Sequence, residues 1–433
     1  MRTAAVIGIL LVGLGLRVGY AVEQPAARPP DAQAYARIAE SLYLHGSFDA
    51  RPPGASHEMQ PASAYSPGLP LFVAAVYLLS GGVHLTLALV LLALLGATAI
   101  PMAYLLGRRF AGPAAGLIAA AAVAVYPALL EYQGLPLTEP LAAFLLGAVL
   151  VLFFRACDRP GDLWRWAGFG AVFGALAMVR PEYLVLAALL PLAWLPREAR
   201  RGRPRRALTP LAVSLLATIV VLAPWTIRNA IVLGRLVPVS TGGGKALFIG
   251  TYLDAHGDGV QLRELLLAQR PALRARLARG GPVDDPNRYV LERVLARVAA
   301  ARYPGLETDA ALGRLGRQNL SHDLTDEPLR FAGMLAGKAF ETWTDAPRAT
   351  MEKQPWRTLQ LAIVVLALIG LAALGFGPGR RFEALICALV LAYMTAVAAL
   401  LIASPRRELV VLPLLAPLAG TGAVWLWGRL RGG

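Results

Sequence analysis

Long apolar runs separated by short arginine-rich segments dominate the chain from end to end. A helix of about 20 apolar residues crosses the hydrocarbon core of a bilayer, and ten of the runs approach or reach that length. We expect transmembrane helices at 3–22, 83–106, 112–129, 138–156, 164–179, 182–195, 207–225, 357–376, 383–403 and 408–428. The pattern therefore predicts an all-α polytopic membrane protein with about ten transmembrane helices.

The orientation follows from one shorter apolar run, Gly68–Ser80. With only about a dozen residues, it suits an interfacial or re-entrant segment of the amphipathic first outer loop better than a span. If it does not cross, five arginine clusters fall on the cytoplasmic side, as the positive-inside rule requires: 108–109, 155–165, 197–206, 380–381 and 429–431. If it crossed, the most basic cluster would face outward. We therefore expect a multi-pass protein of the cytoplasmic (inner) membrane with both termini inside.

Two polar stretches are large enough to carry function. The first outer loop, 23–82, contains Pro29–Gly46, which begins after prolines and ends at a glycine as one short helix would. The stretch 227–355 has periodic leucines among arginines and glutamates, which predicts a small, mostly helical extracytoplasmic domain. The expected domains are an N-terminal transmembrane catalytic module, 1–226, the extracytoplasmic domain, 227–355, and C-terminal transmembrane helices, 356–433.

Composition supports the membrane assignment. The chain is 57% hydrophobic and 16% charged, whereas a soluble protein carries about 25% charged residues. The net charge of +15 lies in arginines between apolar runs, which records membrane orientation and argues against nucleic-acid binding. The first apolar run lacks a small-residue cleavage site, so we interpret it as a retained anchor. Cys157 and Cys387 fall within or beside spans and indicate neither a disulfide framework nor a zinc site.

Two acids stand at outer ends of spans. Asp31 shares a helix face with Tyr35, Ile38 and Leu42, at spacings of four, three and four. Taken locally, Asp31 is most simply an N-cap, because aspartate accepts hydrogen bonds from the first turn of a helix. Glu139 begins a span on the same side of the membrane, where an acid also offsets the helix dipole. Charged groups beside a bilayer are costly, so both acids are functional candidates.

Arginines accumulate on the same side: Arg180, Arg228, Arg406 and Arg407. Each alone could anchor at the headgroup level. Together with two acids they indicate arginines that hold a phosphate and a carboxylate that takes a proton from a nucleophile. Such a set suits displacement of a lipid phosphate leaving group. Arg17, in the outer third of the first span, either snorkels to the interface or meets an anionic ligand.

Two other patterns carry no chemistry. Thr241–Lys245 is similar to a phosphate loop, but it lacks the first glycine and the hydroxyl residue after the lysine. The five histidines are scattered without metal-ligand spacing. Pairs such as His57–Glu58 and His256–Asp258 are more typical of polar loops than of metal sites. The residues therefore predict no metal ligands.

The order of these features resembles the polytopic, lipid-phosphate-sugar-dependent glycosyltransferases of the GT-C superfold. The likeness is to the family 39 group, which is protein-mannosyltransferase-like and lipid-A aminoarabinose-transferase-like. It covers most of the chain except about 255–325. The segments that carry it, in chain order, are Arg17, Asp31-x-x-x-Tyr35, Ser66–Leu71, Thr138–Pro140, Arg180–Glu182, Pro224–Asn229, Gly234–Thr241 and Arg406-Arg407.

The resemblance implies an inverting transfer of a hexosyl or pentosyl unit from a polyprenyl-phosphate carrier to an envelope glycan, lipid or protein on the outer face. It implies that Asp31 is the general base and Glu139 a supporting acid. Expected contacts to the carrier phosphate or sugar are Tyr35, Tyr65, Arg180, Arg228, Asn229, Arg406 and Arg407. Ala32 stands where the family often has a second acid, so a divalent metal is left open and no other cofactor is expected.

Two other functions remain as alternatives. A transporter or flippase of lipid-linked sugars would place ionisable groups near mid-membrane and interrupt helices in related halves of the chain. An O-antigen ligase or polymerase also has a large outer loop, but it needs no acid directly after the first span. The acids of this chain lie at span ends, which favours the glycosyltransferase. The expected partners are the sugar donor, the acceptor and the bilayer.

Overall fold

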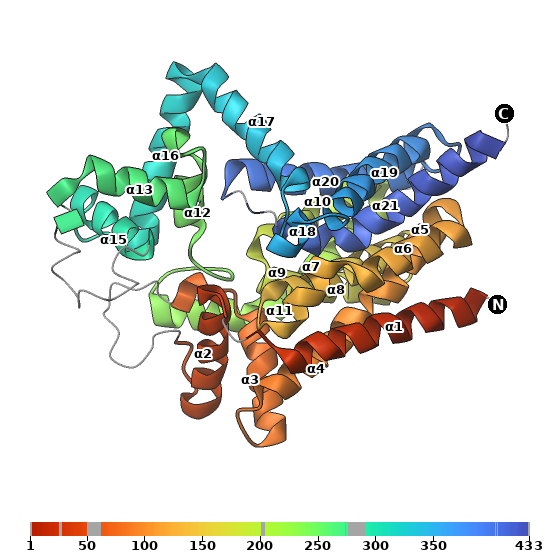
Figure 1. The fold of residues 1–433 in the computed structure, drawn as a ribbon, viewed down its shortest axis with the longest axis horizontal. Helices are drawn as coiled ribbons and strands as arrows, with labels where there is room; N and C mark the ends of the chain where they lie inside the picture. Colours follow the sequence, from red (N-terminus) through yellow and green to blue (C-terminus); the bar gives the residue numbers. More distant parts are fainter. Residues whose placement is uncertain are drawn as a thin grey trace.

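A computed structural model describes residues 2–25, 28–49, 62–200, 204–272, 274–275, 291–402, 404 and 406–431. Within these ranges every regular element is a helix. Figure 1 shows a bundle of long helices with a smaller group of helices at one end, while both chain termini lie at the opposite end. The predicted all-α membrane architecture is confirmed.

Seven helices of the described part are long and apolar enough to cross a membrane. They are α1 (Arg2–Glu23), the continuous α4 (Leu85–Ala97) and α5 (Ala99–Ala111), α8 (Thr138–Asp158), α11 (Pro204–Leu233), α19 (Trp356–Phe376), α20 (Arg381–Leu400) and α21 (Arg406–Arg431). Counted as one broken helix, α6 (Pro113–Val125) with α7 (Pro127–Glu131) and η2 (Tyr132–Gly134) makes an eighth candidate span, bent by 48°. The centre of the bundle is formed by α8 and α21, each with 78% of its span buried.

The predicted count of ten differs from this count by two short helices. The run at 164–179 forms α9 (Leu163–Val179) with 17 residues, which rise about 26 Å and fall a little short of a hydrocarbon core of about 30 Å. The run at 182–195 forms α10 (Leu186–Ala199), which has 14 residues and two internal prolines. Both helices pack against α11 in the bundle. The turn between them, with η3 (Pro181–Tyr183), carries Arg180.

The first loop contributes two helices with the expected bounds. The helix α2 (Pro30–His45) ends at Gly46, whose φ of +64° places it in the left-handed region that favours glycine. After η1 (Ala62–Ala64), α3 (Gly68–Ser80) is a short helix that packs between α2 and α4. Part of this loop, residues 50–61 with His57 and Glu58, lies outside the described residues.

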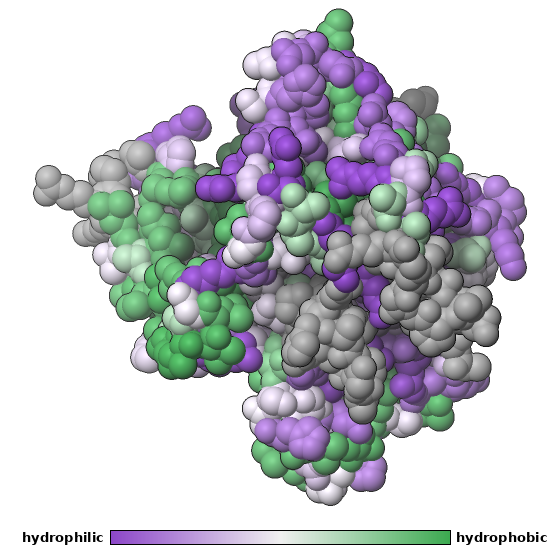
Figure 2. All heavy atoms as spheres, turned by 90° about the vertical axis from the view of Figure 1, so that its left-hand side faces the viewer, coloured by the Kyte–Doolittle hydropathy of each residue, from purple (hydrophilic) through white to green (hydrophobic). Residues whose placement is uncertain are grey.

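A smaller group of helices, here called the distal unit, covers the end of the bundle that carries α2. It comprises α12 (Gly243–Gly250), η4 (Leu253–Ala255), α13 (Gly259–Gln269), α15 (Leu291–Arg302), α16 (Thr308–Asp326) and α17 (Pro328–Thr344). The short helix α18 (Ala349–Glu352) follows and packs on α7 and α19 of the bundle. Leucines and Phe248 form the apolar core of the distal unit. Figure 1 shows α17 returning from the tip of the unit to the bundle, where it packs on α20. Figure 2 shows hydrophilic side chains over the upper part of this end.

Two further details concern the start of this region and the packing of its helices. The helix α11 continues to Leu233, past the predicted domain boundary at 226. In the glycine-rich run, a Cβ on Gly244 would lie 1.9 Å from the carbonyl oxygen of Asp309. That glycine therefore lets α12 and α16 pack with their backbones in contact.

Arg17 neither snorkels nor faces a ligand-sized opening; it is fully buried against the end of α6. Pro127 has no N–H, so the carbonyl of Val123 loses its helical partner at the bend. Arg17 Nη2 donates to that carbonyl at 2.7 Å, and Nη1 donates to Ala124 O at 3.1 Å. An unpaired carbonyl inside a membrane costs several kcal/mol. The arginine therefore stabilises a broken helix.

We expect Arg17→Leu to lower the free energy of unfolding by about 2–4 kcal/mol, because it leaves two buried carbonyls unpaired. Urea unfolding in lipid micelles, followed by tryptophan fluorescence, measures this change. Arg28→Leu is the control, since Arg28 only pairs with the side chain of Gln24 near the surface. Equal stability of the Arg17 variant and the wild type would contradict this structural role.

Candidate active site

A cavity of about 280 Å³ lies where five segments end at the same side of the bundle. Its walls come from α2, the residues before α3, the start of α8, the α9–α10 turn and the start of α21. The lining residues are Asp31, Tyr35, Tyr65, Ser66, Leu137, Thr138, Glu139, Val179, Arg180, Glu182, Ile402, Ser404, Arg406 and Arg407. Seven of the nine site residues predicted from the sequence therefore lie around one cavity.

Asp31 lies in the first turn of α2 but does not cap it. Pro29 is the N-cap residue, and among the described residues no side chain caps this helix. Asp31 Oδ2 instead accepts a hydrogen bond from Arg406 Nη1 at 3.2 Å. The Asp31 side chain is 54% exposed. The local capping interpretation is therefore wrong, and the carboxylate is within reach of a molecule in the cavity.

Apolar packing holds α2 in place. Ala34 and Ile38 pack with Phe48 and Trp225 in a small buried cluster. Tyr35 meets the ring of Tyr65 edge to face, with centroids 5.3 Å apart. Burial raises the pKa of both phenols, so each hydroxyl stays protonated at neutral pH. The two tyrosines thus form a neutral wall beside Asp31.

Tyr65 is brought to the cavity by a close backbone contact. A Cβ on Gly68 would lie 2.6 Å from Val179 Cγ2 and 2.9 Å from the backbone carbon of Met178. Glycine therefore lets the start of α3 lie against the end of α9, next to Arg180.

The floor of the cavity is a buried group of charges. Glu139, only 2% exposed, accepts from Arg180 Nη2 at 2.9 Å, and Glu182 accepts from Arg180 Nη1 at 3.3 Å. Burial opposes the charge on Arg180, but the two carboxylates outweigh it and raise the pKa of the guanidinium. The second oxygen of Glu139 has no hydrogen-bond partner in the described part of the chain. Arg180 is thus neutralised by protein groups, and one buried carboxylate oxygen remains available.

Arg406 and Arg407 form the positive side of the cavity. They occupy the first turn of α21, where the helix dipole is already positive and basic residues are unfavourable. Arg406 pairs with Asp31, while Arg407 Nη1 donates only weakly to Val397 O at 3.4 Å. Two guanidinium groups at a helix N-terminus make a strong anion site.

Arg228 and Asn229 do not line the cavity. The guanidinium of Arg228 lies over the ring of Trp225, 4.9 Å from its centroid. Asn229 Nδ2 donates to the carbonyls of Val237 and Val239 at 3.0 and 2.9 Å. The Pro224–Asn229 motif therefore fixes the chain that leads to Thr241.

That chain in turn supports the cavity wall. The backbone N–H of Thr241 donates to Ser63 O at 2.7 Å, and the two hydroxyls lie 3.2 Å apart. Ser63 precedes Tyr65 by two residues. In this structure the motif acts on the cavity indirectly, through the position of Tyr65.

Glu182 was not among the predicted site residues, although it faces the cavity and pairs with Arg180. The sequence did contain a signal for Glu182, since this residue stands two residues after Arg180 in the same turn. Ser66, Thr138 and Ser404 were also missed as lining residues. Small hydroxyl residues beside span ends are too common to stand out in a sequence.

The donor set suits an anion better than a divalent cation. In the part of the chain that the structure describes, no three His, Cys, Asp or Glu side chains gather as a metal site. Each acid of the cavity already faces an arginine. A divalent ion would therefore have to compete with a guanidinium for each of these carboxylates.

No protein-family model matches this sequence, and no curated protein matches it. Solved structures of oligosaccharyltransferase AglB from Archaeoglobus fulgidus match the fold. The complex with an inhibitory peptide and a dolichol-phosphate has a TM-score of 0.60 and 14% identity, covering 99% of this chain and 51% of AglB. The complex with Zn and sulfate has a TM-score of 0.57 and 14% identity, covering 99% of this chain and 49% of AglB.

A structure of ArnT from Cupriavidus metallidurans bound to undecaprenyl phosphate has a TM-score of only 0.41 at 15% identity, covering 100% of this chain and 79% of ArnT. That score is too low to bear on this chain. The chain spans about half the length of the AglB structures. The likeness to AglB shows a shared fold, and the predicted GT-C fold is confirmed.

We expect Glu139→Gln to lower the free energy of unfolding by about 2–3 kcal/mol, because Arg180 would lose its most buried partner. Glu182→Gln, at a more exposed position, is the matched control with a loss of about 1 kcal/mol or less. Thermal unfolding in detergent compares the two. The double variant Glu139→Gln/Arg180→Gln should regain part of the loss, and a Glu139 variant as stable as the wild type would contradict the pairing.

Proposed function

We propose that this GT-C chain is a membrane glycosyltransferase that moves a sugar from a polyprenyl-phosphate carrier to an acceptor on the outer face of the membrane. The observation that carries the proposal is the pairing of an exposed carboxylate, Asp31, with an arginine at the positive end of α21. Solved AglB structures contain dolichol-phosphate in one case and sulfate in another. A phosphate carrier suits the anion site described above.

Arg406 and Arg407 are the proposed ligands of the carrier phosphate. Arg180 is less suited, because Glu139 and Glu182 already neutralise it. Arg407 has only a weak contact with a backbone oxygen, and the pair of Arg406 with Asp31 is partly exposed. Partly exposed ion pairs are worth about 1 kcal/mol or less, so a phosphate can replace the carboxylate on Arg406.

That exchange would link binding of the donor to the release of Asp31, the proposed base, from Arg406. Without a donor, Asp31 accepts a hydrogen bond from Arg406 at 3.2 Å. When the carrier phosphate takes over Arg406, Asp31 is released next to the sugar. The carboxylate is then free to accept a proton only in the presence of the donor.

The proposed transfer can be written with Asp31, Arg406 and Arg407. The acceptor hydroxyl attacks the anomeric carbon and gives its proton to the Asp31 carboxylate. The bond between that carbon and the phosphate oxygen breaks, and the carrier phosphate leaves with the electron pair, stabilised by Arg406 and Arg407. A single displacement inverts the anomeric carbon. The available oxygen of Glu139 would accept a hydrogen bond from a sugar hydroxyl.

The arginines at the other end of the bundle support the outer face. Arg109 pairs there with Asp158 and Glu383, and Arg429 lies over Trp425. Both arginines belong to clusters counted for the positive-inside rule, which favours the outer end for the cavity. The charge distribution supports an active site on the extracytoplasmic face of the inner membrane.

The flippase alternative is less well supported. The ionisable residues inside spans make contacts typical of structural groups: Arg17 binds carbonyls of α6, and Glu408 accepts from Tyr126 and Gln360 at 2.9 and 2.8 Å. A transport path would instead place such groups on a water-filled route. Asp31, the exposed acid of the cavity, lies at the end of the bundle.

We expect Asp31→Asn to reduce transfer of a labelled sugar from a polyprenyl-phosphate donor by about 10²–10⁴-fold, the usual contribution of a general base. Binding of the carrier should stay equal or tighten, because Arg406 loses a competing carboxylate. Glu40→Gln, an exposed acid on the same helix, is the control and should keep full activity. Full transfer by a normally expressed Asp31 variant would sink the assignment.

We also expect a photoreactive polyprenyl-phosphate probe to label peptides that contain Asp31 or Arg406, as mapped by mass spectrometry. Arg406→Gln should weaken probe binding by about tenfold, because it removes a charge-assisted contact. Arg429→Gln, at the opposite end of the bundle, is the matched control. Labelling confined to the middle of the bundle would favour the flippase.

A further inference from the structure

The position of Arg406 and Arg407 depends on a short connection between two spans. α20 ends at Leu400 and α21 begins at Arg406. Of the described residues between them, Ile402 and Ser404 line the cavity. Whatever holds this connection therefore sets where the two guanidinium groups point.

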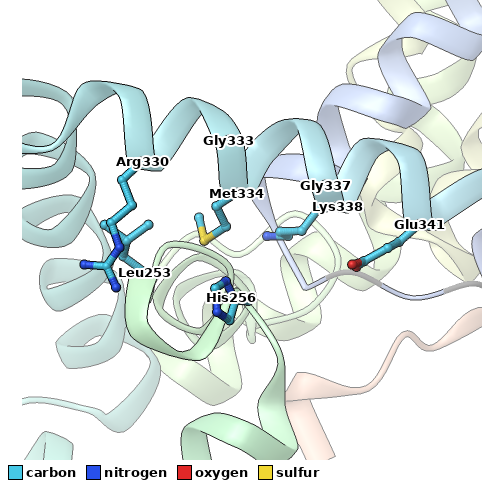
Figure 3. Close-up of a pocket in the computed structure, with 8 residues that line it drawn as sticks. All are labelled: Leu253, His256, Arg330, Gly333, Met334, Gly337, Lys338 and Glu341. Atoms are coloured by element: carbon cyan, nitrogen blue, oxygen red, sulfur yellow. The ribbon is translucent and has the colours of Figure 1, made fainter.

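Lys338 of α17 holds the connection from the distal unit. Its side chain is buried, with 2% of the residue exposed. Its Nζ donates to the carbonyl of Leu401 at 2.6 Å and to that of Gly250, the last residue of α12, at 2.9 Å. Figure 3 shows Lys338 on the cavity side of α17, at the edge of a cavity of about 320 Å³ that His256 and Met334 also line.

Two glycines bring the three segments into contact. A Cβ on Gly250 would lie 2.5 Å from Leu400 O and 2.6 Å from Leu401 O, so the end of α12 touches the connection directly. A Cβ on Gly257 would lie 2.6 Å from Lys338 Nζ, so this backbone covers the amine. The amine is thus covered by this backbone and held against the two carbonyls.

Burying a lysine costs more free energy than burying an apolar side chain of similar size. Burial lowers the pKa of Lys338 to about 8, with Arg407 also disfavouring the charge and Glu341 favouring it. A methionine would fill the space without that cost. The amine instead donates to the carbonyls of Gly250 and Leu401, which belong to segments about 150 residues apart in the chain.

We infer that Lys338 is a positioning residue, which ties the α20–α21 connection to the distal unit and so orients Arg406 and Arg407 toward an anion. Its effect on sugar transfer rests on the proposed function. The positioning itself does not, and it can be measured on the connection directly. The distal unit would then act on the donor site through this contact.

The direct test is a nitroxide label at Ser404→Cys, with the buried Cys157 and Cys387 replaced by alanine. We expect Lys338→Met to narrow the electron paramagnetic resonance lines, because the connection gains mobility. Glu341→Gln, one turn further along α17 at the same cavity, is the control and should leave the spectrum unchanged. An unchanged spectrum in a folded Lys338 variant would overturn the inference.

The binding test uses polyprenyl phosphate without a sugar. Lys338→Met should weaken its binding by about tenfold, and in an Arg406→Gln background it should add less than about twofold, because both changes remove one contact. Fully additive losses would mean that Lys338 acts only on stability. If Lys338→Met does not fold, Gly250→Ala is the second variant, since its methyl group pushes on the same connection with the lysine retained; an unchanged label spectrum there would also overturn the inference.

The two proposals fail in different ways. If the label responds to Lys338→Met but the wild type binds no polyprenyl phosphate, the positioning stands and the proposed donor is wrong. If the wild type binds the carrier and the label does not respond, the donor stands and Lys338 has no positioning role.

Discussion

The high cost of charge and of unpaired backbone in hydrocarbon is the constraint on which this structure depends. At the bend before Pro127, inside the bundle, Arg17 supplies the donor that proline lacks. Only at the ends of spans can polar groups face a cavity. Five segments end together beneath the distal unit, and acids and arginines from them face one cavity there.

The charges in that cavity have separate roles because their surroundings differ. Arg180 is enclosed by two carboxylates and serves as a fixed floor. Arg406 and Arg407 lie where a helix dipole adds to their charge, so this side attracts an anion. The pair of Asp31 with Arg406 joins the two functions, since an anion that binds the arginine frees the acid. The contact of Lys338 with Leu401 connects this pair to the distal unit.

Local signals in the sequence were enough for most of the helices. The bounds of α3 equal the predicted Gly68–Ser80, and α2 ends at the predicted Gly46, because prolines and glycines act within one turn. Apolar runs located all the long spans for the same reason. The number of spans was harder to predict at α9 and α10, whose lengths fall below that of a full span. The structural role of Arg17 was not predicted, because its partners are carbonyls 106 and 107 residues away.

The sequence by itself predicts which side of the membrane each candidate occupies, since hydrophobicity and arginine clusters act along the chain. It could not decide which span ends meet. Asp31 and Arg406 are 375 residues apart and pair directly, whereas Arg228 and Asn229, on the same side, turn toward Trp225 and the 237–239 backbone. Helix packing alone selects between these outcomes, because side-chain contacts across a bundle depend on how distant helices fit together.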